Sequence, residues 1–156
     1  MDASPFTAIA TSISMSSEAN PDSCTIEGLI AANAAFYAAF ETLDMEDFRQ
    51  VNAVSEDSVC IHPGRKPVYG WEAIQDSWSG IFEHTTYMSI SPSDVKAHLQ
   101  GVVGWVTCVE NIYSFIEVEQ ILGRVVATNL FKWTDSGWKL VLHHGSPILQ
   151  SDDLES

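Results

Sequence analysis

The fold is decided by the last apolar stretch of the chain, Trp138-Lys139-Leu140-Val141-Leu142-His143-His144-Gly145-Ser146-Pro147. Apolar and polar residues alternate along it until a glycine and a proline end the pattern, as in a β-strand. Because successive strand side chains point to opposite faces, His144 is predicted to share the apolar face of Trp138 and Leu140. His143 is predicted on the opposite face. Since imidazole titrates near neutral pH, His144 is predicted to bring a proton-exchanging group into the interior.

Three further strands precede this stretch. Apolar residues alternate with polar ones over residues 95–99, and two longer strands are predicted over 102–115 and 120–133. Short turns separate them, the last formed by Asp135-Ser136-Gly137. Strands joined by such short connections pair in antiparallel order, so the second half of the chain is predicted to be a meander.

The first half of the chain has helical periodicity. Apolar residues recur at three- and four-residue spacing over 26–43, and a short second helix is predicted after Asp44 and up to Val51. A small hairpin spans 59–69, and a third helix with an aromatic stripe begins at Trp71. Helices followed by strands predict the α+β class, with three N-terminal helices packed against one curved antiparallel sheet.

The composition predicts one domain. Residues 25–149 carry the periodic pattern, whereas 1–24 read as a flexible N-terminal tail and 150–156 as an acidic C-terminal tail. Secretory and transit signals contain lysine or arginine, but the first two dozen residues of this chain contain neither. Cytoplasm is therefore the predicted location. No apolar run approaches the ~20 residues that would span a bilayer.

The charge of the chain limits its partners. Seven basic and 21 acidic residues give a formal net charge of -14, which disfavours binding to nucleic acid or to anionic membranes. The three cysteines have no CxxC spacing, and the histidines lack a third ligand at metal-binding spacing. Neither a metal nor a cofactor is therefore predicted.

The order of these elements resembles the nuclear transport factor 2-like superfamily, and within it the SnoaL-like branch. The resemblance covers about residues 24–149 and is carried by His62-Pro63, by the segment from Gly70 to Trp78, and by the ending from Trp138 to Pro147. It implies a cone-shaped sheet closed on one side by helices around an internal cavity. Members of the superfamily include isomerases, dehydratases, assembly domains and proteins without a reaction, so the fold does not select the function.

Three polar residues interrupt apolar strand faces in the meander. Glu110 and Asn129 lie on two neighbouring strands and His144 on the third, so they are predicted to converge in one pocket. His62, at the end of a short strand, is predicted to reach the mouth of that pocket. The resemblance supports the same positions for His62 and His144. A dry carboxyl group beside an imidazole forms an acid/base pair, so His144 and Glu110 are the predicted catalytic pair and His62 the group that orients the substrate.

Aromatic and small side chains are predicted to line this pocket. The predicted ligand-binding set consists of Asn129, Trp78, Trp71, Tyr69, Phe131 and Cys108. Such a lining suits a small hydrophobic or ring-shaped molecule. Trp105, Tyr113 and Phe115 are predicted on the opposite, outward face of the sheet, where a homodimer would cover them.

Three functional interpretations remain open at this point. The first is a cofactor-independent isomerase or lyase that works by proton transfer. The second is a ligand-binding or dimeric assembly module without turnover. In the third, Glu110, Asn129 and His144 form a buried hydrogen-bond network that only fixes the sheet.

Overall fold

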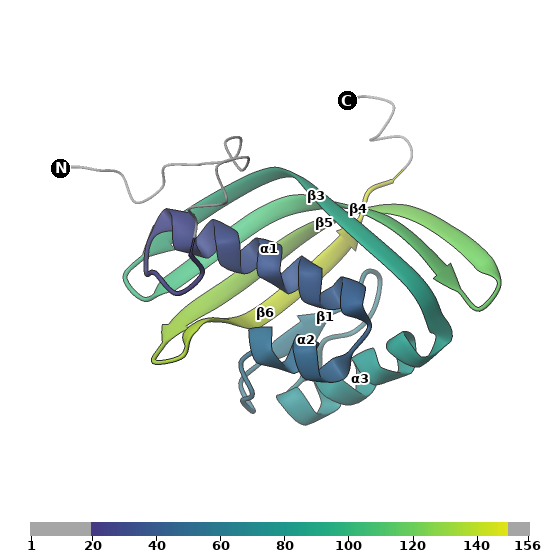
Figure 1. Cartoon of the computed structure of the whole chain (residues 1–156), viewed down its shortest axis with the longest axis horizontal. Coiled ribbons are helices and arrows are strands. Elements are labelled where there is room, and N and C mark those ends of the chain that lie inside the picture. The colour runs from purple at the N-terminus through teal and green to yellow at the C-terminus, as the bar shows by residue number, and fades with distance from the viewer. Residues whose placement is uncertain (1–19, 150–156) are drawn as a thin grey trace.

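A curved, six-stranded sheet wraps around three helices (Figure 1). The computed structural model describes residues 20–149. The strands are β1 (Val59–Ile61), β2 (Val68–Tyr69), β3 (Thr85–Gln100), β4 (Val103–Ile116), β5 (Glu119–Thr134) and β6 (Gly137–Pro147). Their order in the sheet is β2-β1-β6-β5-β4-β3, and only the β1–β6 pair is parallel. The predicted α+β class and the antiparallel meander are confirmed.

Two of the three helices begin at capping side chains, and the third follows Gly70 without one. The helices are α1 (Ile26–Thr42), α2 (Met45–Val51) and α3 (Trp71–His84). The Thr25 hydroxyl accepts a hydrogen bond from Gly28 N, and the Asp44 carboxylate accepts one from Glu46 N. Between them, Leu43 adopts a left-handed conformation with φ 56°, which ends α1 and turns the chain into α2.

The core lies between the helices and the concave face of the sheet. Phe36 and Phe40 of α1, Phe48 of α2 and Trp78 of α3 form one aromatic cluster, with ring centroids 4.5–5.7 Å apart in neighbouring pairs. Edge-to-face and tilted contacts dominate it, as the quadrupoles of aromatic rings favour. This cluster fixes the helices over the middle of the sheet.

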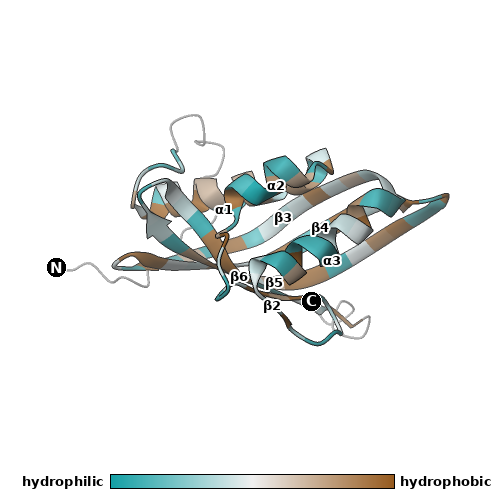
Figure 2. Ribbon diagram, turned by 90° about the horizontal axis from the view of Figure 1, so that it is seen from below, coloured by the Kyte–Doolittle hydropathy of each residue, from teal (hydrophilic) through white to brown (hydrophobic). Residues whose placement is uncertain are grey.

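The convex side of the sheet remains exposed. Tyr87, Tyr113, Leu122 and Val126, which we call the outer face, have exposed fractions of 51%, 37%, 67% and 43%. Figure 2 shows apolar segments along the long strands as far as the β4–β5 hairpin. Of the positions predicted to face outward, Tyr113 is exposed, while Trp105 and Phe115 are half-buried.

The predicted N- and C-terminal tails lie mostly outside the described residues. Residues 1–19 and 150–156, which belong to the two predicted tails, lie outside the described region. Within it, residues 20–24 contact the domain, since Trp138 Nε1 donates a hydrogen bond to Ser23 O at 2.8 Å. None of the helices in residues 20–149 is long and apolar enough to span a membrane.

The tight contact between α1 and β4 gives a first testable prediction. A Cβ on Gly104 would lie 2.5 Å from Leu29 Cδ2, and Leu29 is fully buried. Gly104→Ala is therefore expected to lower the free energy of unfolding by about 1–3 kcal/mol in urea denaturation. Gly80→Ala is the control, because its Cβ would meet nothing within 4 Å and alanine favours the helix. Equal losses in both variants would contradict the packing described.

Candidate functional site

A β-bulge in β6 decides which histidine enters the interior. Leu142 pairs with Leu130 and Leu140 with Phe131, so Val141 is an extra residue without a partner on β5. The bulge reverses the alternation downstream of it. His143 is 4% exposed and faces the core, whereas His144 is exposed. The predictions that His144 faces inward and His143 outward are therefore wrong, because they assume an unbroken strand.

His143 joins a buried network that includes the two other predicted strand residues. Glu110 on β4 and Asn129 on β5 are 5% and 0% exposed, and both face the core as predicted. Tyr37 on α1 lies between them. The Tyr37 hydroxyl is 2.6 Å from Glu110 Oε2 and 3.0 Å from Asn129 Nδ2. Asn33, one turn earlier on α1, completes the network.

The donors and acceptors of this network follow from Asn129. Its Nδ2 donates to Asn33 Oδ1 at 2.9 Å and to the Tyr37 hydroxyl at 3.0 Å, so its Oδ1 faces His143. That oxygen can only accept, and His143 Nδ1 at 2.6 Å must be the donor. The proton of neutral His143 is thereby fixed on Nδ1. The lone pair remains on Nε2, which lies 3.8 Å from Glu110 Oε2.

Burial sets the protonation of this pair. It raises the pKa of the Glu110 carboxyl to about 7, although the hydrogen bond from Tyr37 opposes this shift. Burial, with smaller contributions from His62 and His144, lowers the pKa of His143 to about 3. Burial and the negative charge of Glu110 raise the pKa of Tyr37 far above its usual value. At neutral pH, His143 and Tyr37 are neutral and Glu110 exchanges between its two forms.

His62 is buried but lies outside the network. Its Nε2 is 2.8 Å from Ser77 Oγ, and its ring packs edge-on against Trp78 with centroids 4.6 Å apart. Burial and the positive charge of Arg65 lower the pKa of His62. Trp78 also lies 6.4 Å from the His143 ring, between centroids. The aromatic ring of Trp78 therefore lies close to the rings of both His62 and His143.

The predicted ligand-binding residues fall into two groups. Trp78, Trp71, Phe131 and Cys108 are buried in the core together with Asn129. Cys108 Sγ lies 3.4 Å from the Tyr37 hydroxyl. Tyr69, by contrast, is 68% exposed, because on the edge strand β2 its neighbour Val68 takes the inward position. The prediction that Tyr69 lines an internal pocket is wrong.

The interior beside His143 is nearly filled. The cavity there has a volume of about 10 Å³ and is bounded by aromatic side chains that include Phe36, Phe48 and Trp78. Such a volume holds about one water molecule. The cavity that borders His143 is therefore too small in this conformation for the ligand that the sequence predicts.

The sequence interpretation passed over two residues of the network, Asn33 and Tyr37. Both belong to the apolar stripe of α1, four residues apart, and both are at most 2% exposed. Polar groups that interrupt an apolar strand face were the signal for Glu110 and Asn129. The same signal on the helix face would have identified Asn33 and Tyr37.

The comparison with known proteins can now be set beside this geometry. A SnoaL-like domain matches the chain over residues 29–150. The chain belongs to the SnoaL-like domain family. The predicted resemblance to the NTF2-like superfamily is confirmed, and the buried Tyr-Glu-Asn-His network is the polar interior of a SnoaL-like domain.

Two proteins of solved structure have related sequences. A candidate dehydratase from Streptomyces avermitilis is 34% identical with a TM-score of 0.75, and the match covers 80% of this chain and 96% of that one. A candidate calcium/calmodulin-dependent protein kinase type II association domain from Thiobacillus denitrificans is 29% identical with a TM-score of 0.62, over 77% and 94% of the two chains. This SnoaL-like domain is thus similar both to a protein named for a reaction and to one named for assembly.

A third relative is a longer chain. The F-box protein SKIP8 of Arabidopsis thaliana is 22% identical over 128 residues, which cover 82% of this chain. The match covers 53% of SKIP8, so the present chain spans about half the length of that relative.

The raised pKa of Glu110 predicts how stability depends on pH. The folded protein holds the proton of this carboxyl up to about pH 7, whereas the unfolded chain releases it near the usual pKa of 4.5. The free energy of unfolding therefore falls as the pH rises from about 4.5 to about 7. Glu110→Gln retains an acceptor for Tyr37 but cannot ionise. Relative to the wild type, this variant is expected to gain about 1–3 kcal/mol in free energy of unfolding between about pH 4.5 and pH 8.

Urea denaturation at several pH values measures this gain. Glu119→Gln, at an exposed glutamate, is the matched control and should follow the wild-type curve. If Glu110→Gln and the wild type differ by the same free energy at every pH, Glu110 does not titrate in this window.

Proposed function

We propose that this SnoaL-like domain catalyses cofactor-independent proton transfer, of the kind used in isomerisation or dehydration, on a small and partly hydrophobic molecule. The observation that carries the proposal is the buried Glu110 carboxyl between the Tyr37 hydroxyl and the His143 ring, with a pKa of about 7. A catalytic acid or base works best when its pKa is near the working pH. Strongly perturbed buried carboxyls concentrate at functional sites.

Glu110 is the proposed catalytic residue. In its ionised form it accepts a proton from a carbon beside a carbonyl of the substrate, and the electron pair of the broken C–H bond moves onto the carbonyl oxygen to give an enolate. In its neutral form it returns the proton to another carbon of the enolate, which completes an isomerisation. In a dehydration it instead protonates a hydroxyl two carbons from the carbonyl; the carbonyl re-forms, the electron pair forms a C=C bond, and the C–O bond breaks to release water. Both forms are populated near neutral pH, so one group can serve both half-reactions.

The other members of the network position this carboxyl. Tyr37 donates to Glu110 Oε2, and Asn129 holds both Tyr37 and His143 through its amide. Neutral His143 presents Nε2 as an acceptor toward the same oxygen. These fixed dipoles favour a single orientation of the carboxyl without a counter-charge. They replace the acid/base partner that the sequence assigned to His144.

The closed interior requires that a ligand displaces side chains. The space beside His143 holds about one water molecule, and Phe48 and Trp78 form part of its wall. Both aromatic residues belong to helices rather than to the sheet, and α2 is only seven residues long. Movement of α2 and α3 away from the sheet would open the pocket while leaving the network of α1 and the strands intact.

The test uses proton exchange as a readout that needs no natural substrate. A set of small cyclic ketones is incubated with the protein in D₂O, and the loss of the proton beside the carbonyl is followed by NMR. The wild type should accelerate exchange of at least one ketone, and Glu110→Gln should lower that rate about 100-fold. His144→Ala, at an exposed histidine, should exchange like the wild type.

Two results would contradict the assignment. Exchange that survives Glu110→Gln would remove Glu110 from the chemistry. Exchange that is lost equally in His144→Ala would restore the histidine favoured by the sequence.

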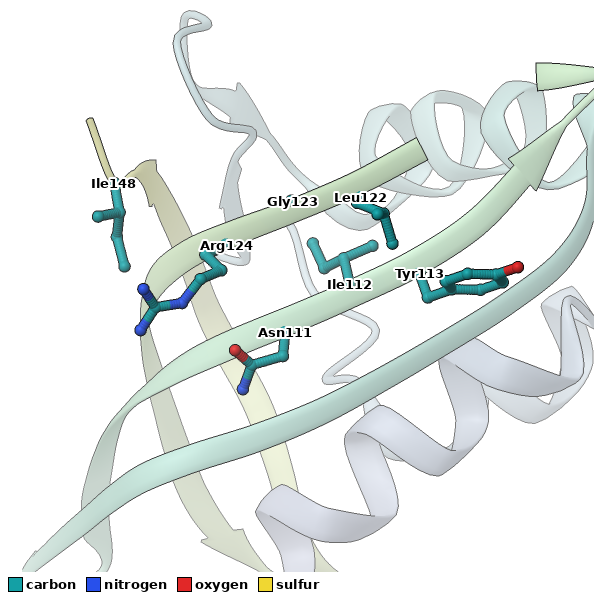
Figure 3. Close-up of a pocket in the computed structure, with 7 residues that line it drawn as sticks. All are labelled: Asn111, Ile112, Tyr113, Leu122, Gly123, Arg124 and Ile148. Carbon is teal, nitrogen blue, oxygen red and sulfur yellow. The ribbon is translucent and has the colours of Figure 1, made fainter. Parts of the chain in front are cut away.

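A second function, assembly through the outer face, is favoured by an independent observation. Tyr87, Tyr113, Leu122 and Val126 remain exposed on the convex side of the sheet. A hollow of about 570 Å³ lies beside Tyr113 and Leu122, between the side chains of β4 and β5 and Ile148 (Figure 3). An exposed apolar sheet face is typical of an interaction surface, and homodimers are the commonest assemblies. The relative named as an association domain supports the same use of the fold.

Light scattering coupled to gel filtration tests the dimer. The wild type should elute with the mass of two chains, and Leu122→Lys should elute as one chain because it places a charge in the buried centre of the interface. Val54→Lys is the control, since Val54 is 52% exposed but lies outside the outer face. A wild type that elutes as a single chain at high concentration would exclude this interface.

A further inference from the structure

A groove of about 300 Å³ lies between α1 and β3. Ile30, Asn33 and Ala34 of α1 form one wall, and residues 92–95 of β3 form the other. Its volume lies at the lower end of the range for small-molecule sites. Asn33 both lines this groove and accepts a hydrogen bond from Asn129. A single hydrogen bond, from Asn129 to Asn33, therefore connects the groove to the proposed site.

The β3 wall of the groove offers acceptors from its backbone. β3 is the last strand of the sheet, so one of its edges has no partner strand. Ile90 N donates across that edge to the Glu41 carboxylate at 2.8 Å. Two residues further, Pro92 has the same orientation and no N–H group, so it presents only a carbonyl oxygen.

A bulge brings a carboxylate to the rim of the same groove. The pairing of β3 with β4 shifts between Ser93 and Lys96, and Asp94 adopts a left-handed conformation with φ 52°. Val95 is thereby turned into the core at 8% exposure, and Asp94 is left exposed. Bulges beside sites re-aim side chains in this manner. The carboxylate of Asp94 is paired with Lys96 on its own strand.

The Asp94–Lys96 pair is easily exchanged for a ligand. The two side chains are 65% and 48% exposed, and ion pairs in such surroundings contribute little stability because water screens them. A cationic ligand can therefore replace the lysine at small cost. The formal net charge of -14 also raises the local concentration of cations over anions.

The chemistry of the walls identifies one class of ligand. We propose that the groove binds a small primary amine with an apolar ring or chain, whose ammonium group lies at Asp94 and the Pro92 carbonyl. Its apolar part packs on Ile30, Ala34 and Val95. The groove would then be the binding subsite for an amine-bearing substrate of the Glu110 network. That role rests on the proposed function, whereas the binding itself does not.

The first experiment measures binding with benzylammonium as the probe. Titration is followed in ¹H–¹⁵N NMR spectra, and the amides of Ala34 and Val95 should shift. Benzyl alcohol and benzoate, which have the same ring, should bind more weakly, benzoate least. Equal binding of benzylammonium and benzoate would overturn the proposal, because the acceptors of the groove would then not select a cation.

Two variants with a matched control locate the site. Ala34→Trp should fill the groove and abolish the shifts, while Ala38→Trp, one turn further on the exposed side of α1 and outside the groove, should leave them unchanged. Asp94→Asn should weaken benzylammonium about fivefold and leave benzyl alcohol unaffected; asparagine tolerates the left-handed backbone. Binding that survives Ala34→Trp, or weakens equally in both tryptophan variants, would overturn the proposal.

The ketone exchange assay separates this inference from the proposed function. If the protein exchanges ketone protons but does not bind benzylammonium, the amine site in the groove is excluded and Glu110 remains the proposed catalytic residue. If the protein binds benzylammonium but exchanges no ketone protons, the groove remains an amine site and the proposed catalytic function is excluded.

Discussion

The two-sided hydrogen bonding of the Asn129 amide is the interaction on which the interior depends. Its nitrogen reaches α1 at Asn33 and Tyr37, and its oxygen reaches β6 at His143. One side chain at 0% exposure thus joins the first helix to two strands. A residue with only donors or only acceptors could not satisfy both sides. The amide also dictates the tautomer of His143, so it sets chemistry as well as architecture.

Burial without counter-charge gives the site its chemical character. No lysine or arginine takes part in the described contacts of Glu110, and the neighbouring histidine is itself held neutral by burial. A carboxyl in such surroundings avoids ionisation until the pH approaches neutrality. The protein thereby keeps an acid in its interior at a cost in stability. A purely structural hydrogen bond from Tyr37 of α1 to β4 would not require that cost, since an amide would serve equally well.

The sequence predicts the helices and the long strands because their periodicity is regular, and α1 and α2 also have conventional caps. It also identifies Glu110 and Asn129, which interrupt apolar strand faces without any irregularity between them. It fails at His143 because the bulge at Val141 is not marked by a glycine or proline. Tyr37 escapes notice for a different reason, since a tyrosine on an apolar helix stripe resembles ordinary core packing. The closure of the pocket depends on the packing of four aromatic rings, which periodicity does not describe.

The adjacent histidines of β6 give this site a tolerance that a single histidine would lack. If β6 slid by one residue along β5, His144 would take the position opposite Asn129 that His143 now holds, because a shift of one residue exchanges the two faces of a strand. A slide of one residue in this direction would therefore still present an imidazole to the amide, whereas a slide in the other direction would present Leu142. The doubled histidine thus protects the buried polar contact against one of the two single-residue register shifts.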